Sequence, residues 1–388
     1  MTEIRIIISG GGTGGHIFPA VSIANAIREL RPDAQILFIG AEERMEMQRV
    51  PQAGYAIKGL PIRGFFRPLW KPQNISVAID YLRSKRMAKQ ILREFRPQVA
   101  VGVGGYASSA ALGAANSLGI PTLIQEQNSY AGLANKQLAS QASKICVAYE
   151  GMERFFPKDK IMLTGNPVRQ SLLDAKVTRE EALNAFGLDP KKKTILLVGG
   201  SLGARTINES VLAHLKEIAD SDLQFIWQTG KYYSEEMNRR LKEYTDSNVA
   251  SHPSPLTSHL VVTEFISDMA AAYRAADLVV SRAGASSISE FCLIGKPVIL
   301  VPSPNVAEDH QTKNALALVN RDAALYVKDA EAREKLIPLA INTVVDDARL
   351  KTLSENVLKM ALPDSARIIA QEVLKLAAQP LPKGGKSE

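Results

Sequence analysis

Four glycine-rich turns each follow a run of β-branched and aliphatic residues and precede a helical pattern. They occupy residues 10–16, 104–106, 199–204 and 283–287. A strand that ends in such a turn at a helix N-terminus presents unpaired backbone N–H groups and the positive end of the helix dipole, which suit phosphate or pyrophosphate. Because two turns fall in each half of the chain, we predict a nucleotide-type anion held between two similar lobes.

The first turn carries five glycines among residues 10–15. Glycine lets the backbone approach an oxyanion closely and adopt positive φ. A tight strand-to-helix turn can need glycine for geometry alone, but one turn does not need five, so we favour an anion-binding loop. His16, in the helical turn that follows, can either cap the helix or touch a reacting group.

Polar residues 125–128 directly follow a predicted buried strand at 122–124. Glu126 is the only carboxylate among them and is a candidate general base or hydroxyl binder; a capping cluster is the alternative. No metal site is expected, because the five histidines form no H-E-x-x-H pattern. The Asp-x-Asp at 220–222 comes before a predicted strand. A metal-binding pair of this kind would be expected at the end of a strand, so we read it as a loop.

In the second half, residues 285–290 open a helix with hydroxyls that can cap it or bond phosphates. Glu290, one turn into this helix, is suited to bidentate contact with a ribose diol. A polar stretch at 308–311, with Gln311 at its end, suits sugar hydroxyls or a solvated helix start.

Residues 62–96 hold nine Lys or Arg against two acidic residues, interleaved with aromatic side chains. Exposed aromatic groups ringed by cations suit the interface of an anionic membrane. The predicted membrane patch consists of Phe65, Phe66, Trp70, Arg67 and Lys71. Nucleic acid is not expected as a partner because no recognised nucleic-acid motif occurs, and a core-plus-surface reading of these apolar residues remains open.

Strand and helix patterns alternate throughout, which predicts an α/β protein with two Rossmann-like, doubly wound lobes facing a cleft. Strands are expected near 4–9, 35–39, 99–103, 121–124, 144–148, 194–198, 223–228, 260–264, 277–281 and 297–301. We expect an N-terminal lobe at 1–165, a C-terminal lobe at 166–360, and a helix and tail at 361–388 that can return to the first lobe. Only two cysteines occur and no signal peptide is recognised, so a cytoplasmic setting is expected.

The motifs, taken together and in order, resemble the MurG family of N-acetylglucosaminyltransferases over essentially the whole chain. They are 10–16, 102–108, 126–128, 165–169, 199–205 and 263–266. The resemblance implies a GT-B fold and inverting transfer from UDP-N-acetylglucosamine to the 4-hydroxyl of undecaprenyl-pyrophosphoryl-N-acetylmuramoyl-pentapeptide (lipid I), which gives lipid II in peptidoglycan biosynthesis. It implies no cofactor or metal, and a peripheral location at the cytoplasmic face of the inner membrane.

Carried over by position, the resemblance also implies the substrate contacts. The donor contacts are Thr13, Gly14, Gly15, Asn128, Arg169, Ser201, Ile266, Ala285, Ser286, Ser287, Ile288, Ser289, Glu290 and Gln311. The backbone of Ile266 would read uracil and Glu290 the ribose, while His16 and Glu126 would lie near the acceptor hydroxyl or its pyrophosphate. Many relatives carry histidine where this chain has Gln125, so that histidine cannot be essential here.

Three other functions are compatible with parts of the pattern. A UDP-N-acetylglucosamine 2-epimerase would share the donor site but would need no membrane patch. A dinucleotide-dependent oxidoreductase fits the G-x-G-x-x-G spacing at 10–15 and Glu42 after the second strand, but leaves the other three turns unexplained. A non-catalytic nucleotide-sugar binder would need the donor site alone.

Overall fold

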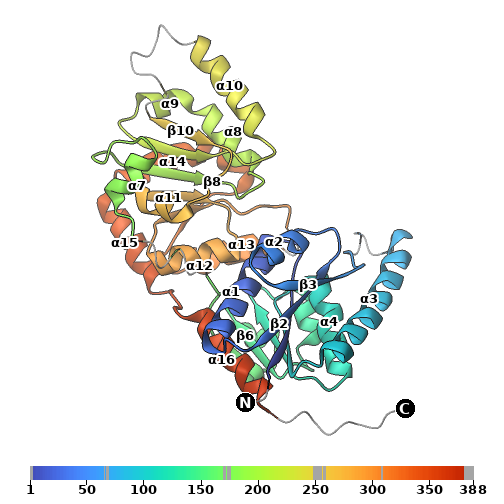
Figure 1. Ribbon diagram of the computed structural model, residues 1–388. Helices are drawn as coiled ribbons and strands as arrows, with labels where there is room; N and C mark the ends of the chain where they lie inside the picture. The colour runs from blue at the N-terminus through green and yellow to red at the C-terminus, as the bar shows by residue number, and fades with distance from the viewer. Residues whose placement is uncertain are drawn as a thin grey trace. The chain divides into compact units, whose positions relative to one another are not determined.

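The computed structural model describes residues 3–64, 66, 70–168, 172, 176–247, 256, 259–306 and 309–379. The chain forms two compact units, each built around its own parallel sheet (Figure 1). Unit 1 consists of Met1–Arg169 and Leu362–Glu388, and unit 2 consists of Gln170–Ala361.

Unit 1 contains a seven-stranded sheet in the order β3-β2-β1-β4-β5-β6-β7, with every neighbouring pair parallel. The strands are β1 (Arg5–Ser9), β2 (Gln35–Ala41), β3 (Ala56–Leu60), β4 (Val99–Gly102), β5 (Thr122–Glu126), β6 (Lys144–Val147) and β7 (Ile161–Leu163). The chain winds outward from β1 in one direction and then, from β4, in the other. This is a doubly wound sheet whose switch point lies between β1 and β4.

Helices cover both faces of this sheet. They are α1 (Gly14–Leu30), α2 (Glu46–Gln52), α3 (Gln73–Phe95), α4 (Tyr106–Ser117), α5 (Leu133–Leu138) and α16 (Ser365–Ala377). Ile6 and Ile8 pack toward α1 and α16, which lie side by side, whereas Ile7 packs toward α3 and α4 on the opposite face (Figure 1). The continuous apolar run of β1 is thus explained, because a parallel strand covered on both faces has no solvent side.

Unit 2 repeats the scheme with a six-stranded parallel sheet in the order β10-β9-β8-β11-β12-β13. Its strands are β8 (Thr194–Val198), β9 (Gln224–Gln228), β10 (Leu260–Thr263), β11 (Leu278–Ser281), β12 (Val298–Leu300) and β13 (Leu325–Tyr326). Its helices are α7 (Arg179–Ala185), α8 (Arg205–Ala213), α9 (Leu215–Asp220), α10 (Ser234–Ser247), α11 (Met269–Ala275), α12 (Ala285–Ile294), α13 (His310–Val319), α14 (Asp329–Val344) and α15 (Asp347–Leu358). The expected α/β class with two doubly wound units is confirmed.

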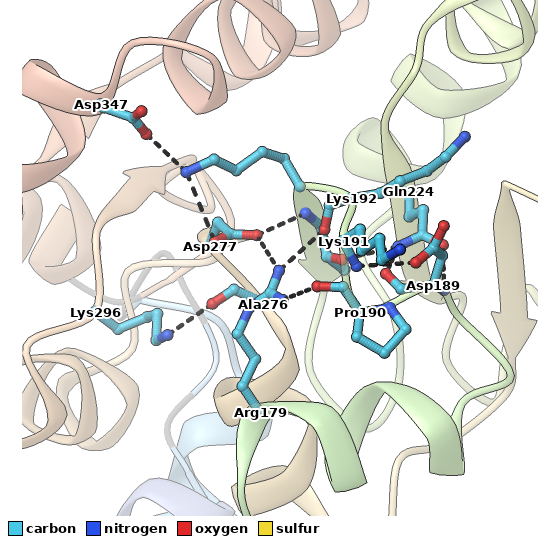
Figure 2. Close-up of polar contacts among 12 residues, drawn as sticks. Arg179, Asp189, Pro190, Lys191, Lys192, Gln224, Ala276, Asp277, Lys296 and Asp347 are labelled. Atoms are coloured by element: carbon cyan, nitrogen blue, oxygen red, sulfur yellow. Dashed lines mark hydrogen bonds and ion pairs between the residues drawn. The ribbon is translucent and has the colours of Figure 1, made fainter.

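A polar cluster holds the amino-terminal edge of the unit 2 sheet (Figure 2). The Asp277 carboxylate accepts hydrogen bonds from Arg179 at 2.9 Å and from the backbone N–H of Thr194 at 2.8 Å, which ties α7 to the start of β8. Lys296 donates to the carbonyl of Ala276 at 2.6 Å, and burial lowers the pKa of its ammonium group to about 8. Since ligands in this architecture sit at the carboxyl ends of the strands, we read the cluster as structural.

Candidate functional site

The carboxyl edge of the unit 1 sheet brings together the loops after β1, β4 and β5, which are adjacent strands. His16 Nδ1 lies 2.9 Å from the carbonyl oxygen of Gly11. A Cβ built on Gly104 would lie 2.8 Å from His16 Nε2, and one on Gly105 would lie 2.7 Å from that same carbonyl oxygen. The first two glycine-rich turns are therefore in direct contact at the switch point of the sheet.

Four of the five glycines in residues 10–15, a segment that we call the glycine loop, fall into two groups. A Cβ on Gly10 or Gly11 would come within 2.0 Å of a buried side chain, Val103 or Glu46, so these two positions need glycine for packing. Gly12 adopts φ +85° in open space, and a Cβ on Gly15 would meet nothing closer than 3.6 Å. Packing among the described residues therefore does not explain Gly15, and its predicted role in ligand binding stays a prediction.

The chain enters α1 with its first amides exposed. Thr13 is the N-cap residue in an extended conformation, and no side chain caps the helix. Gly14 and Gly15 form the start of α1, where backbone N–H groups have no intrahelical partner. Thr13 and Gly15 are exposed and Gly14 is half-buried. This is the arrangement that a phosphate oxygen can use.

His16 is oriented by its contact with the glycine loop. A carbonyl oxygen can only accept a hydrogen bond, so Nδ1 carries the proton in its contact with Gly11. In the neutral ring, Nε2 is then a proton acceptor, and it lies against Gly104. The side chain is half-buried at the carboxyl edge.

Glu126 is almost fully buried, and its carboxylate is surrounded by donors from the loop that follows it. It accepts from the backbone N–H and the side-chain amide of Asn128 at 3.0 and 3.2 Å, from the Gly132 N–H at 3.0 Å and from the Asn135 amide at 2.8 Å. This set of contacts fixes the loop that carries Asn128. The predicted catalytic role of Glu126 stays a prediction, and the contacts fit a positioning role better.

Gln125 belongs to a buried chain of amides beside this loop. Its Nε2 donates to Asn166 at 2.9 Å, Asn166 donates to the Gln127 carbonyl at 3.0 Å, and Gln127 donates to the Val103 carbonyl at 2.8 Å. Gln125 is thus a wholly buried member of this network.

In unit 2, the loops after β8 and β11 meet at the corresponding switch point. Ser201 is exposed, and its carbonyl accepts the Lys231 N–H at 3.2 Å, which holds the loop against the turn after β9. The side chain of Ile266 is buried, and the reading of uracil by its backbone stays a prediction. The Gln311 carbonyl oxygen accepts the N–H of Ser303 at 2.9 Å, which fixes the orientation of that amide.

The predicted donor helix is α12, whose N-cap is Gly284. Gly284 has no side chain with which to cap the helix. Ala285, Ser286 and Ser287 form its first turn and are half-buried. Ser289 donates to the Ala285 carbonyl at 3.1 Å.

Farther along α12, Ile288 is a core side chain and Glu290 is buried. One carboxylate oxygen of Glu290 accepts the hydroxyl of Tyr273 at 3.0 Å. The Tyr273 ring packs edge-on against Phe291, with centroids 5.6 Å apart. Tyr273 therefore orients the carboxylate that the sequence predicts to bind ribose.

Sequence reasoning missed three residues that hold site loops or site side chains in place. They are Glu46, Tyr273 and Arg282. Arg282 follows β11, donates to the carbonyl of Val301 at 3.0 Å and pairs with Asp329 at the start of α14. A polar residue directly after a buried strand was a signal for Arg282, whereas Glu46 and Tyr273 had none.

Several predicted residues need separate mention. Arg169, Phe65 and Arg67 lie outside the described residues. Phe66, Trp70 and Lys71 are exposed, and Trp70 is 85% exposed. Within the described ranges, no three His, Cys, Asp or Glu side chains gather as a possible metal site, and no helix is long and apolar enough to cross a membrane.

Comparison with known proteins gives a consistent result. The glycosyltransferase family 28 N-terminal domain matches residues 6–147, and the family 28 C-terminal domain matches residues 194–369. A Bacteroides fragilis protein named UDP-N-acetylglucosamine–N-acetylmuramyl-(pentapeptide) pyrophosphoryl-undecaprenol N-acetylglucosamine transferase is 65% identical over 378 residues, which is 97% of this chain and 96% of that protein.

Two solved structures are informative about the fold. Acinetobacter baumannii MurG has a TM-score of 0.73 at 26% identity, covering 96% of this chain and 99% of that one. The UDP-N-acetylglucosamine 2-epimerase of Neisseria meningitidis has a TM-score of 0.63 at 15% identity, covering 96% and 100% respectively, and so shares the fold alone. Because the two family models match both halves of the chain and the 65% identity to a named transferase extends over 97% of it, the chain belongs to glycosyltransferase family 28 and, within it, to the MurG family of N-acetylglucosaminyltransferases.

Proposed function

We propose that this chain transfers N-acetylglucosamine from UDP-N-acetylglucosamine to the 4-hydroxyl of lipid I, with inversion, to form lipid II. One observation carries the proposal: 65% identity over 97% of the chain to a transferase named for this reaction. The site geometry supports it, because each unit presents helix N-terminal amides at the switch point of its sheet, where a pyrophosphate-bearing substrate binds in this architecture.

We assign donor recognition in unit 2 to α12 and the residues around it. The first-turn amides and the hydroxyls of Ser286 and Ser287 would bond the UDP phosphates, with Ser201 and Gln311 as further contacts. Glu290, held by Tyr273, would accept both hydroxyls of the ribose. As the sugar–phosphate bond breaks, charge develops on UDP, and preorganised amides stabilise that charge without rearranging.

We assign proton removal from the acceptor hydroxyl to His16 and loop positioning to Glu126. His16 Nε2 is a proton acceptor as long as Nδ1 donates to Gly11. The buried Glu126 carboxylate, with four donors around it, holds Asn128 instead. The remaining contacts carried over for unit 1 are Thr13, Gly14, Gly15, Asn128 and Arg169.

We further propose that unit 1 binds the cytoplasmic face of the inner membrane through α3. Ile75, Ile79 and Leu82 recur at helical spacing and are 69%, 61% and 67% exposed. The other side of the helix, with Ala88 and Leu92, is buried against α4 and β3. A solvent-facing aliphatic stripe on a soluble helix is typical of an interaction surface, and this one extends the predicted patch beyond Trp70.

Beyond Leu82, positively charged residues continue the same helical spacing along α3. Arg86, Lys89 and Arg93 follow Leu82 and line a hollow of about 650 Å³. The rest of its lining is Arg5, Gln90, Glu94 and Arg96, so cations outnumber the single carboxylate. Cations beside an apolar stripe suit anionic headgroups.

The experiment is transfer of labelled N-acetylglucosamine to a short-chain lipid I analogue, with and without EDTA. Transfer that survives EDTA supports the proposed reaction and its metal-free stabilisation of UDP. Recovery of UDP with N-acetylmannosamine would instead indicate the epimerase, and intact donor would indicate a binder.

The membrane assignment has its own test. We expect a variant with Ile75, Ile79 and Leu82 changed to serine to lose binding to anionic vesicles while keeping full activity on the short-chain acceptor. Leu133→Ser, which changes an equally exposed leucine on α5, is the matched control. Unchanged vesicle binding by the triple variant would place the membrane contact elsewhere.

A further inference from the structure

We infer that Glu46 is a positioning residue that presets the glycine loop for a substrate pyrophosphate. Glu46 is the first residue of α2 and is wholly buried. Its Oε2 accepts the N–H of Gly12 at 2.9 Å, and its Oε1 accepts the N–H of Ala41 at 3.0 Å. One carboxylate thus joins the loop after β1 to the end of the neighbouring strand β2. The inference rests on the proposed function, because a pyrophosphate substrate gives the loop its task.

The surrounding backbone is shaped to admit this side chain. A Cβ on Gly11 would lie 2.0 Å from Glu46 Oε1, and a Cβ on Gly40 would lie 2.6 Å from Glu46 Cγ. Gly11 is therefore explained by this side chain, and Gly40 by it together with Ile57, whose Cδ1 would lie 3.0 Å from the same Cβ.

The charge of Glu46 argues for a geometric role. Within the described part of the chain, its hydrogen bonds are those two amides, and no Lys, Arg or His pairs with it. Burying a carboxylate without a cation is costly, and a negative charge beneath a loop that binds an anion opposes that binding. The benefit that offsets both effects is control of the loop conformation.

The contact with Gly12 is placed where it controls the entry into α1. Gly12 has φ +85°, Thr13 is extended, and the helix begins at Gly14. Because the Gly12 N–H donates to Glu46, it does not bond the ligand, and its direction also fixes the direction of the amides that follow. The amides of Gly14 and Gly15 are then aimed before substrate arrives, which lowers the ordering cost of binding.

The first test is Glu46→Gln, which keeps the shape but offers one acceptor oxygen and turns an NH₂ group toward the other amide. We expect the KM of one pyrophosphate substrate, donor or acceptor, to rise about tenfold while kcat stays within about twofold. Which KM rises assigns the loop to that substrate. Glu42→Gln removes the same charge from an exposed neighbour and is expected to leave both KM values unchanged.

A purely structural role would give a different result. Partial unfolding lowers the active fraction, so kcat would fall with both KM values intact. That outcome, or equal changes in both KM values, would overturn the inference.

The second test uses the unaltered chain and needs neither a folded variant nor transferase activity. Gly12 is exposed, yet its N–H is bonded to a buried carboxylate. We expect slow amide hydrogen exchange at Gly12 and fast exchange at Thr13 in the substrate-free protein, resolved by fragmentation mass spectrometry. Fast exchange at Gly12 would overturn the inference even if lipid II is formed. Absence of transfer with slow exchange at Gly12 would instead contradict the proposed function alone.

Discussion

The substitution Gly15→Ala tests whether residue 15 must be glycine because a ligand approaches it or because neighbouring side chains pack against it. Gly15 is the second residue of α1, and a Cβ there would meet only the Thr13 hydroxyl oxygen, at 3.6 Å. Alanine restricts the unfolded chain without straining the folded one, so the substitution should stabilise the protein by roughly 0.4–1 kcal/mol. The melting temperature should then rise by about 2 °C for a unit of this size.

Activity should change in the opposite direction. The new methyl group occupies the approach to the first-turn amides, and loss of one hydrogen bond to a charged phosphate costs about 1.5–3 kcal/mol. Since 1.4 kcal/mol corresponds to tenfold in an equilibrium constant, the KM of the substrate that uses the loop should rise at least about tenfold. The variant should thus be more stable and less active.

The assay combines thermal unfolding by circular dichroism with KM determinations for donor and acceptor. Gly11→Ala is the contrasting variant: its Cβ would lie 2.0 Å from Glu46 Oε1, so it should lose roughly 1–3 kcal/mol of stability. A Gly15→Ala enzyme with raised melting temperature and unchanged KM values would refute the reasoning, because it would show that no ligand approaches that amide.

Three further predictions concern unit 2 and the thiols. Tyr273→Phe removes the hydroxyl that orients Glu290, so the KM for UDP-N-acetylglucosamine should rise about tenfold, whereas exposed Tyr232→Phe should change nothing; equal effects would contradict the assignment. Burial lowers the pKa of Lys296 to about 8, so between pH 8 and 10.5 the unfolded chain binds more protons than the folded one. In urea unfolding, the free energy of unfolding of the wild type should therefore rise with pH by up to about 3 kcal/mol relative to that of Lys296→Met across this range. A difference between the two proteins that does not change with pH would mean that the ammonium group is not desolvated. Burial raises the pKa of both cysteine thiols to about 12, so Ellman's reagent at pH 8 should label neither in the folded protein and both after unfolding, and rapid labelling of either would disprove their burial.

The central strands could be predicted from sequence because they are buried on both faces and carry uninterrupted apolar runs. The expected strand at 4–9 is β1, Arg5–Ser9, and the expected helix at 15–30 is α1, Gly14–Leu30. The strands β3, β7 and β13 were not predicted. All three lie at sheet ends. β7 and β13 are short, and β3 includes an exposed Lys58 and a glycine, so they lack that apolar run.

The site could be predicted only where chemistry follows a strand directly. The predictions at residues 10–16, 125–128 and 285–290 rest on this signal. Glu46 could not be predicted, because its partners are backbone amides of other segments, and such amides carry no sequence signature. Ile79 and Leu82 were missed for the opposite reason: apolar residues at helical spacing predict a buried face, and only packing shows that α3 buries its other side.

The place of α16 has a consequence for biogenesis. Ile369, Ala370 and Val373 complete the core that α1 and β4 begin, although all of unit 2 separates them along the chain. A ribosome making this protein therefore synthesises most of unit 1 first, then unit 2, and last the helix that closes unit 1. Until α16 is made, the apolar residues of α1 and β4 that it contacts lack this covering helix, and exposed apolar surface makes incomplete chains prone to aggregation. Products that terminate before residue 362 lack the helix altogether.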